Sequence, residues 1–455
     1  MRRIVLPLLV ASSLVWAAVS SAATRPRYGG TLHVAIRAAP ASLDPADPVQ
    51  ANSTAAQNIS RLVFDTLVIL DDRGQAQPAL ASSWQSEPGG QRWQFMLRTG
   101  VKFHNGSAFT PDTVAASLRA SNPTWKVFPA TDSVIIECDA AVPDFPAELA
   151  LPRNAIAKRD GNKLFGTGPF AIADWQPGKK LTLTSRDEYW GGRPFVDSIE
   201  IEMGKSLREQ MISLDLGKAD LVEVAPEQAH RAAAEGRQVE SSAPVELMAL
   251  VFSRERQSPE DGKPREALAL SLDRSSLNTV LLQGGGELAG SLLPNWLTGY
   301  AFLFPTGPDL PRARELRDEA QQVPIWTLGY DPTDPVARVV AERISLNARD
   351  AGLKLQLSAA NSADVRLVRI VLPSLNARVA LTGVAAGLGL TPPKFTGNSV
   401  SDLYAAESTL IQSQRVIPLL HIRSSYALSA IVKDWGQDPD ALWRLPEVWL
   451  GTEKP

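Results

Sequence analysis

The chain has 455 residues, of which 44% are hydrophobic and 21% charged, and its formal net charge is -3. This composition is typical of ordinary globular proteins and excludes a disordered chain. The nearly balanced charge provides no basic surface for nucleic acid or for an anionic membrane. A chain of this length exceeds one compact core, so we expect two or three lobes.

The N-terminal residues have the pattern of an export signal. Arg2 and Arg3 precede the apolar run IVLPLLVASSLVWAAV and the small residues SSAA, which signal peptidase prefers near its cleavage site. We therefore expect residues 1–23 to be a cleaved signal peptide and the mature protein to be periplasmic. Because the only cysteine is Cys138, no cysteine follows the cleavage site for lipid attachment, and a lipoprotein is not expected.

Cys138 and the later apolar segments have plain structural interpretations. The cysteine shares one face of a predicted strand with Val134 and Ile136, and a single thiol forms no intramolecular disulfide, so we expect a buried structural residue. The most apolar later stretch, LVRIVLPSLNARVALTGVAAGLGL, is interrupted by Arg369 and Pro373 and is too broken to span a bilayer.

Strand and hairpin patterns dominate the first half of the chain. GGTLHVAI predicts a strand that ends in the loop APASLDP, and WQFMLRTGVKFHNG (93–106) predicts a hairpin that turns at Thr99-Gly100 and reverses again at Asn105-Gly106. The following TPDTVAASLRAS predicts a helix with Thr110 as N-cap. GPFAIADWQPGKKLTLTS predicts a second hairpin, and DSIEIEM another strand.

The later half contains a strand, helix and strand in sequence. VPIWTLGY predicts a buried strand, DPTDPVARVVAERISLNARDAG a helix that begins near Pro335 and ends at Gly352, and LKLQL the next strand. Such a crossover joins parallel strands. The sequence therefore predicts an α/β protein in which at least part of a sheet is parallel.

Patterns of enzymes and metal sites do not occur in the sequence. Its four histidines, His33, His104, His230 and His421, are far apart and form no His-x-x-x-His or Cys/His cluster. There is no Gly-x-Ser-x-Gly elbow, and QGGGELAG lacks the Lys-Ser/Thr pair of a P-loop. We expect no enzyme activity, no metal site and no cofactor.

Five blocks of sequence follow one another in a recognisable order: YGGTLHVAIRAAPASLDP, VFDTLVILDDRGQAQPALASSW, WQFMLRTGVKFHNGSAFTPDTVAASL, GTGPFAIADWQPGKKLTLTSRDEYWGGRPFVDSIEI and PREALALSLDRSSL. In this order they resemble the extracellular solute-binding proteins of family 5, the peptide and nickel receptors of ABC importers. The resemblance covers about residues 28 to 290, and from 290 to 360 it depends mainly on the strand, helix and strand unit. In that family the 93–106 segment belongs to a small extra lobe, so His104 is expected to face solvent or to cap a neighbour.

The resemblance implies an α/β, two-lobed periplasmic-binding-protein fold of type II, with mixed sheets and an extra domain in the first lobe. The two lobes of such receptors close over a ligand by a hinge motion. The implied division is 24–64 for the first segment of lobe I, 65–165 for the extra domain, 166–250 for the second segment of lobe I, 251–419 for lobe II and 420–455 for a return to lobe I.

Family position also implies where a ligand would be contacted. Pro40, Ser42 and Leu43 lie in the loop after the first strand, and His421 lies in the strand from Leu420 to Arg423. From the second lobe, the candidates are Asn295 and Trp296, although core packing is favoured over ligand contact for Trp296.

One family feature is missing from the second lobe. In many relatives a Gly-Trp followed by an Asp-Pro stretch faces the ligand, and here only Asp364 resembles it. The residue that would anchor a peptide amino terminus is therefore not assigned.

The function implied is that of a monomeric receptor. It would capture a small ligand, a peptide in the first place, and deliver it to the ABC permease in the inner membrane. The same fold could instead bind a nickel chelate, haem, an opine or a glycan. One class of a different kind stays open, an exported sensor or chaperone without transport, whereas an unrecognised hydrolase is disfavoured.

Overall fold

The computed structural model describes residues 25–48, 53–255, 261–300, 304–359 and 362–452. The expected signal peptide, residues 1–23, lies outside the described residues. Within these ranges, no helix has both the length and the apolar character needed to cross a bilayer.

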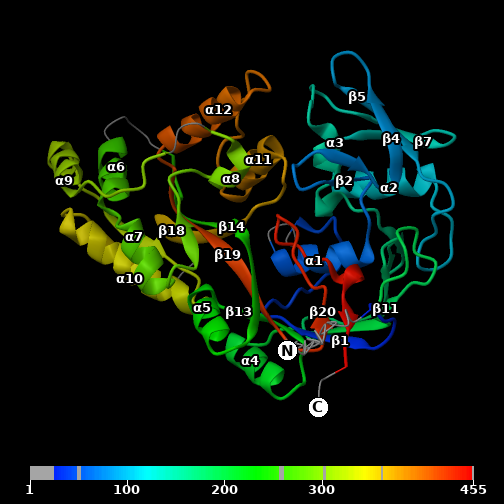
Figure 1. Ribbon diagram of the computed structural model, residues 1–455. Coiled ribbons are helices and arrows are strands. Elements are labelled where there is room, and N and C mark those ends of the chain that lie inside the picture. Colours follow the sequence, from blue (N-terminus) through cyan, green and yellow to red (C-terminus); the bar gives the residue numbers. More distant parts are fainter. Residues whose placement is uncertain (1–24, 49–52, 256–260, 301–303, 360–361, 453–455) are drawn as a thin grey trace, which may run out of the picture.

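A large mixed sheet forms the centre of the molecule (Figure 1). Its strands are β1 (Thr31–Ala35), β10 (Phe170–Gln176), β11 (Lys180–Ser185), β12 (Ser198–Glu202), β13 (Leu221–Val224), β14 (Gln238–Phe252), β15 (Gly286–Leu288), β16 (Ile325–Gly329), β17 (Lys354–Ser358), β18 (Val365–Val371) and β19 (Val416–Leu428). Their order is β10-β11-β12-β1-β13-β19-β14-β18-β16-β17, with β15 paired to β19. β1 is parallel to β12 and β13, and β16 is parallel to β17 and β18.

The long strands β14 and β19 join two lobes. Residues 238–241 of β14 pair with 425–428 of β19 beside β13. Residues 246–251 pair with 416–422 of β19, and residues 246–252 pair with β18 on the other side. Register shifts between Ser241 and Glu246 kink β14 between these halves. The expected boundaries at 250/251 and 419/420 fall inside β14 and β19, and the domain division as a whole stays a prediction.

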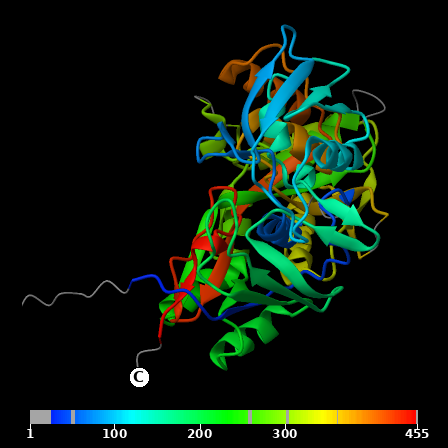
Figure 2. The ribbon, with the colours of Figure 1, turned by 90° about the vertical axis from the view of Figure 1, so that its right-hand side faces the viewer.

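The first lobe has one core that includes the end of the chain. Its helices are α1 (Thr54–Val63), α4 (Leu207–Asp215) and α5 (Pro226–Ala234), and the returning segment adds β20 (Val432–Lys433) and β21 (Trp449–Leu450). Trp443 and Val448 are buried in the same cluster as Leu32 and Ile199. Figure 2 shows this segment, in red, next to green elements of the first lobe.

The second lobe packs helices on both faces of its part of the sheet. Alternate residues of β14 face opposite cores, so Met248 and Leu250 meet one set of helices while Leu247 and Ala249 meet the other. One face carries α6 (Gly262–Ser271), α7 (Arg274–Ser276), α9 (Leu310–Glu319) and α10 (Pro335–Asp350); the other carries α8 (Asn295–Thr298), α11 (Ala377–Gly387) and α12 (Val400–Gln412). The predicted parallel crossover β16-α10-β17 is confirmed.

An extra domain stands beside the first lobe and is built on a small antiparallel sheet. Its elements are β2 (Val68–Leu70), β3 (Ala76–Pro78), β4 (Ala81–Ser86), β5 (Arg92–Leu97), β6 (Lys126–Pro129), β7 (Ser133–Glu137), β8 (Lys158–Asp160), β9 (Lys163–Phe165), α2 (Pro111–Ser121) and α3 (Phe145–Leu149). Phe95, Phe103 and Phe145 fill its core, against which the half-buried Cys138 packs. Thr110 caps α2 in a capping box, as predicted.

The predicted hairpin over residues 93–106 is wrong in its pairing. β5 pairs with β4 and β7 rather than with residues 101–104, because two full strands offer it longer ladders. The turn at Asn105-Gly106 does form, with the Phe103 amide donating to the Ser107 carbonyl at 2.9 Å. His104 caps neighbouring backbone, since its ring lies 3.3 Å from the Gly166 amide and 3.1 Å from the Gly168 carbonyl.

Candidate functional site

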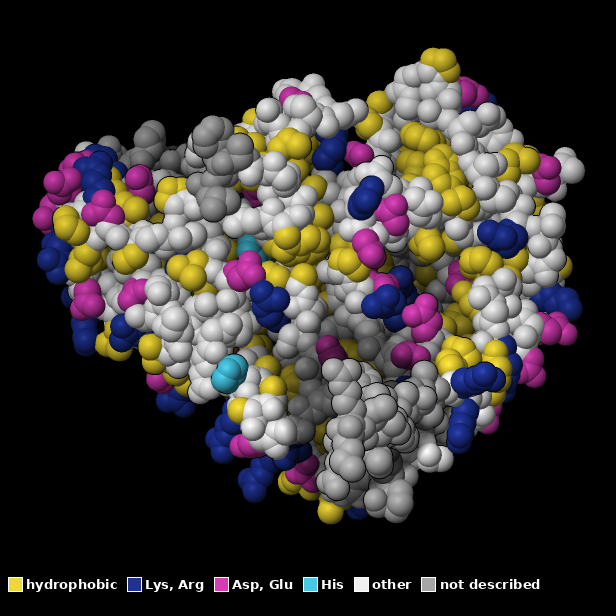
Figure 3. Space-filling view, in the orientation of Figure 1, with side chains coloured by type: hydrophobic (Ala, Val, Ile, Leu, Met, Phe, Trp, Pro, Cys, Tyr) yellow, Lys and Arg dark blue, Asp and Glu magenta, His cyan; other side chains and the backbone are white. Residues whose placement is uncertain are grey.

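A crevice runs between the lobes, and its largest hollow has a volume of about 390 Å³. The walls come from α1, the extra domain, the chain after β18 and the returning C-terminal segment. Figure 3 shows basic and acidic side chains gathered along the boundary between the two halves of this face. We call this space the outer hollow. Its charged lining residues are Arg61, Asp65, Asp72, Asp438, Asp440, Arg444 and Glu447.

Arg61 of α1 ties the C-terminal segment to the wall of the outer hollow. Its Nη1 lies 2.7 Å from an Asp438 oxygen and 3.8 Å from an Asp440 oxygen, and Arg444 approaches Asp438 to 3.4 Å. Burial raises the pKa of Asp440, although Arg61 acts in the opposite direction. Two carboxylates thus share these guanidinium groups where α1 meets the returning chain.

Asp65 forms a second fixed polar group in the outer hollow, just after α1. Its carboxylate accepts hydrogen bonds from Thr167 (2.9 Å), Tyr189 (3.0 Å) and Trp190 (2.8 Å). Burial raises the pKa of Asp65, and these three bonds only partly oppose the shift. These hydrogen bonds hold Tyr189 and Trp190 in the wall of the outer hollow.

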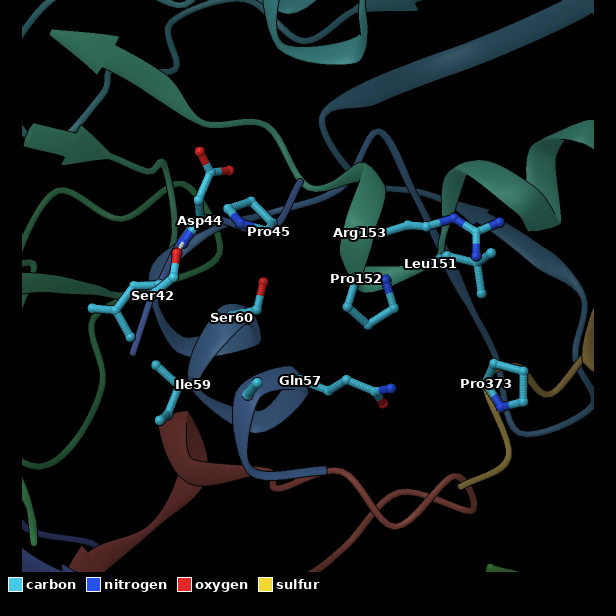
Figure 4. A pocket seen from close by; sticks show the side chains of 12 residues that line it. Ser42, Asp44, Pro45, Gln57, Ile59, Ser60, Leu151, Pro152, Arg153 and Pro373 are labelled. Atoms are coloured by element: carbon cyan, nitrogen blue, oxygen red, sulfur yellow. Dashed lines mark hydrogen bonds between the residues drawn. The ribbon is translucent and has the colours of Figure 1, made fainter. Parts of the chain in front are cut away.

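A narrow extension of about 40 Å³ leads from the outer hollow to the loop after β1 (Figure 4). Gln57 and Ser60 of α1 lie opposite Pro152 of the extra domain and Pro373 of the second lobe. The first lobe, the extra domain and the second lobe therefore all contribute side chains to this narrow extension.

The inner hollow, of about 140 Å³, lies nearer the crossing strands. It adjoins the ends of β1 and β13 and the start of α10 after β16, and the carboxyl ends of strands are where ligands bind in open α/β sheets. Arg369 binds Glu246 and, at 3.1 Å, Asp334. The charged lining residues are Arg37, Glu223, Glu227, Glu246, Asp334, Arg369 and Arg423.

Contacts across the crevice join the extra domain to the second lobe. Arg378 Nε of α11 lies 2.7 Å from Asp144 Oδ2, and both side chains are largely buried. Val379 packs with Ala147 and Leu151 in one small apolar cluster. In this structure the lobes are thus in contact at the outer end of the crevice.

The loop predicted to border the ligand contributes in part. Ser42 and Leu43 line the narrow extension, whereas Pro40 is buried and its carbonyl accepts a hydrogen bond from the Gly178 amide at 3.1 Å. Arg423, at the end of the predicted strand segment, lines the inner hollow. Ligand contact by these residues stays a prediction.

Asn295 and Trp296 are both exposed on α8 and line none of the hollows described above. The Trp296 indole donates to the Pro244 carbonyl at 3.1 Å, at the kink of β14. This contact links α8 to the hinge strand, and a ligand role for the two residues stays a prediction.

His421 is buried in β19, with 4% of its surface exposed, and its Nε2 lies 3.2 Å from the Leu292 carbonyl. It lines neither the outer nor the inner hollow. Burial lowers the pKa of His421 to about 4, with the Leu292 bond opposing this shift. Its predicted ligand contact is untested, whereas its effect on stability follows from the burial.

Lowering the pH should destabilise the protein through His421. Its folded-state pKa lies below the unfolded value of about 6.5, so its contribution is present above pH 6.5 and is lost as the pH falls toward 4. By pH 5 the loss should reach about 1 to 2 kcal/mol. Urea unfolding at pH 7 and pH 5 should therefore show a smaller pH dependence for His421→Gln. The exposed His230, changed to Gln, is the control and should leave the dependence unchanged.

Several residues of the crevice carry no local signal in the sequence. Arg61 and Asp438 meet only through folding, as do Glu227 and Arg369. Asp364, which resembled the family's acidic stretch, accepts hydrogen bonds from the Thr327 amide and hydroxyl at 2.9 and 2.8 Å. The outer hollow instead receives residues 372–375, directly after β18. Across the described ranges, no cluster of three or more His, Cys, Asp or Glu side chains could hold a metal ion.

Comparison with known proteins gives consistent matches. The family described as "Bacterial extracellular solute-binding proteins, family 5 Middle" matches residues 75–396. The chain is 28% identical to the nickel-binding protein NikA of Staphylococcus aureus over 177 residues, 36% of each chain. It is 22% identical to the oligopeptide-binding protein AppA of Bacillus subtilis over 66% of this chain and 60% of AppA. These matches span less than two thirds of either relative's length.

Solved structures match over nearly the whole chain. The dipeptide binding protein of Pseudoalteromonas sp. SM9913, in complex with Met-Leu, has a TM-score of 0.79 and 18% identity, covering 92% of this chain and 100% of that one. At this identity the likeness shows the fold alone. The predicted α/β, two-lobed fold of type II binding proteins, with mixed sheets, is confirmed.

Proposed function

Because this chain belongs to the bacterial extracellular solute-binding proteins of family 5, we propose that it is a periplasmic receptor for a small peptide. It captures the peptide between its two lobes and delivers it to an ABC import permease. The ligand is bound reversibly and is not changed chemically.

The crevice is the observation that carries this proposal. The outer hollow takes residues from the first lobe, the extra domain and the second lobe, so a ligand there touches bodies that move relative to one another. A ligand closes such a receptor only if it binds the closed state better than the open one. The outer hollow has a volume of about 390 Å³, which falls in the range of small-molecule sites.

The relatives support a peptide as the first ligand class to test. AppA is named for oligopeptides, and the Pseudoalteromonas protein holds Met-Leu. NikA is named for nickel, so nickel chelates form the second class. Export by the N-terminal segment is part of the proposal and is supported by its basic start and apolar run.

Ligand binding should appear as thermal stabilisation. At about 100 times its dissociation constant, a ligand raises the unfolding free energy by about 2.7 kcal/mol. We would screen mixed di- to pentapeptides, short glycans, haem and nickel chelates by thermal shift, then identify bound molecules by native mass spectrometry. Shifts with glycans, haem or nickel chelates but not with peptides would reject the peptide assignment, and recovery of a cleaved ligand would reject the receptor itself.

A further inference from the structure

One ion pair joins the extra domain to the second lobe, between α3 and α11 (Figure 1). Arg378 Nε lies 2.7 Å from Asp144 Oδ2, although the two residues are 234 positions apart in the chain. Asp144 directly precedes α3, whose Phe145 is buried in the core of the extra domain. Arg378 belongs to α11, whose Leu381 is buried in a core of the second lobe. Each partner is therefore fixed to its own part of the molecule, and the pair breaks when the extra domain and the second lobe move apart.

The Asp144 side chain is directed toward the second lobe rather than toward its own helix. It occupies the N-cap position of α3, where an aspartate commonly accepts hydrogen bonds from the first amides of the helix. Among the described residues of α3, none donates such a bond to the Asp144 side chain. The carboxylate instead meets Arg378. Asp144 thus contributes to the contact across the crevice and not to the start of its helix.

The Arg378 guanidinium is held in place by its own lobe. Its Nη1 donates to the Gly397 carbonyl, and its Cζ lies 4.2 Å from the centre of the Phe395 ring. Only 16% of the Arg378 side chain is exposed. A guanidinium immobilised in this way loses little further freedom when the carboxylate arrives, so the ion pair forms at a small cost in entropy.

Apolar side chains pack beside the ion pair. Val379 of α11 lies in one buried cluster with Ala147 and Leu151 of the extra domain. Such surroundings lower the local dielectric constant, so the two charges attract each other more strongly than they would at a fully exposed surface. Neither Asp144 nor Arg378 lines any of the three hollows described above. The pair therefore acts on the position of the second lobe and not on the ligand itself.

We propose that Asp144 and Arg378 form a latch that holds the receptor closed from outside the ligand site. This inference rests on the proposed function. Because the pair exists only while the extra domain and the second lobe touch, it stabilises the closed state and contributes nothing to the open state. Both are positioning residues. The extra domain thereby sets how long a ligand is retained.

A latch of this kind acts on dissociation, and it acts equally on every ligand. A ligand enters while the receptor is open and the pair is apart, so association does not depend on the pair. It leaves only after the lobes separate, and separation breaks the pair. A residue that touched the ligand would instead change the binding of different ligands by different factors. A uniform change in the dissociation rate therefore distinguishes a latch from a ligand contact.

Asp144→Ala should release peptides about 3- to 30-fold faster than the wild type. The probes are Met-Leu and tri-alanine, followed by stopped-flow tryptophan fluorescence. Both should show the same factor, with association rates unchanged. The control is Asp139→Ala, which removes a carboxylate of the same domain that is 79% exposed and should behave as the wild type. An unchanged dissociation rate in Asp144→Ala, or clearly different factors for the two peptides, would overturn the inference.

A second measurement needs no ligand. Asp144→Arg places a cation against Arg378, so solution scattering should give this variant a larger radius of gyration than the wild type. Adding Arg378→Glu restores opposite charges and should reverse the expansion, whereas Asp139→Arg should match the wild type. Equal radii for Asp144→Arg and the wild type, or no recovery in the double variant, would contradict the latch, whether or not peptides bind. Expansion and recovery without binding of any peptide would instead support the latch and reject the peptide function.

Discussion

Gly74→Ala should weaken ligand binding by about 5- to 150-fold while leaving the fold intact. Gly74 is buried in the turn between β2 and β3 of the extra domain, opposite Leu375 of the second lobe. A Cβ atom here would overlap the Leu375 carbonyl oxygen and lie 2.7 Å from its carbonyl carbon. Because the obstacle is backbone, no side-chain rotation relieves it, and the lobes must stay farther apart.

The expected size follows from the cost of overpacking. Forcing one extra methyl group into a packed contact costs about 1 to 3 kcal/mol, and each 1.4 kcal/mol is a tenfold change in affinity. Calorimetry with the ligand found by the thermal-shift screen measures the loss. Scattering should also show a larger radius of gyration for Gly74→Ala than for the wild type.

Gly100→Ala is the matched control for this experiment. Gly100 has φ +79°, close to the +71° of Gly74, so both substitutions carry a similar backbone strain. No atom lies within 4 Å of the Cβ position at Gly100, which is exposed in the turn after β5. Wild-type affinity for Gly74→Ala, or an equal loss for both variants, would show that this contact does not control closure.

The fold could be predicted where local patterns decide structure. One continuous segment contains the whole β16-α10-β17 crossover, with Asp334 as the N-cap of its helix. Thr110 likewise marks the start of α2, which begins at the next residue, Pro111. No local sequence pattern predicts which distant strands pair with each other. The segment 93–106 formed its turn but not its predicted hairpin, because β4 and β7 compete for β5 from elsewhere in the chain.

The crevice was predictable only in part, for the same reason. Ser42 and Leu43 follow directly from the family's first block, and both line the narrow extension. Glu227 and Arg369 are 142 positions apart in the numbering, and only the arrangement of the two lobes brings them together. Isolated acids and arginines in a sequence are usually solvated, so no pattern distinguishes these two from the others.

Glu407→Ala should lower the unfolding free energy by about 3 to 5 kcal/mol, the largest stability effect we expect. Glu407 of α12 is fully buried; its Oε1 accepts hydrogen bonds from the amides of Leu292 (2.6 Å) and Leu293 (2.9 Å), and Oε2 accepts one from the Tyr300 hydroxyl (2.8 Å). Alanine leaves these donors without an acceptor, at about 1 to 3 kcal/mol for each unsatisfied buried group. Urea unfolding at pH 7 measures the loss.

Glu407→Gln separates the lost hydrogen bonds from the lost charge. The amide oxygen can still accept from Leu292 and Leu293, and its nitrogen can donate to the Tyr300 oxygen, so the loss should stay within about 1 kcal/mol. Burial raises the pKa of Glu407, so the wild type's contribution from this group is present below the unfolded-state pKa and declines as the pH rises. Glu407→Gln should therefore gain stability relative to the wild type between pH 4 and pH 7. If alanine and glutamine cost the same at pH 7, the hydrogen bonds to this carboxylate do not hold α12 to the segment before α8.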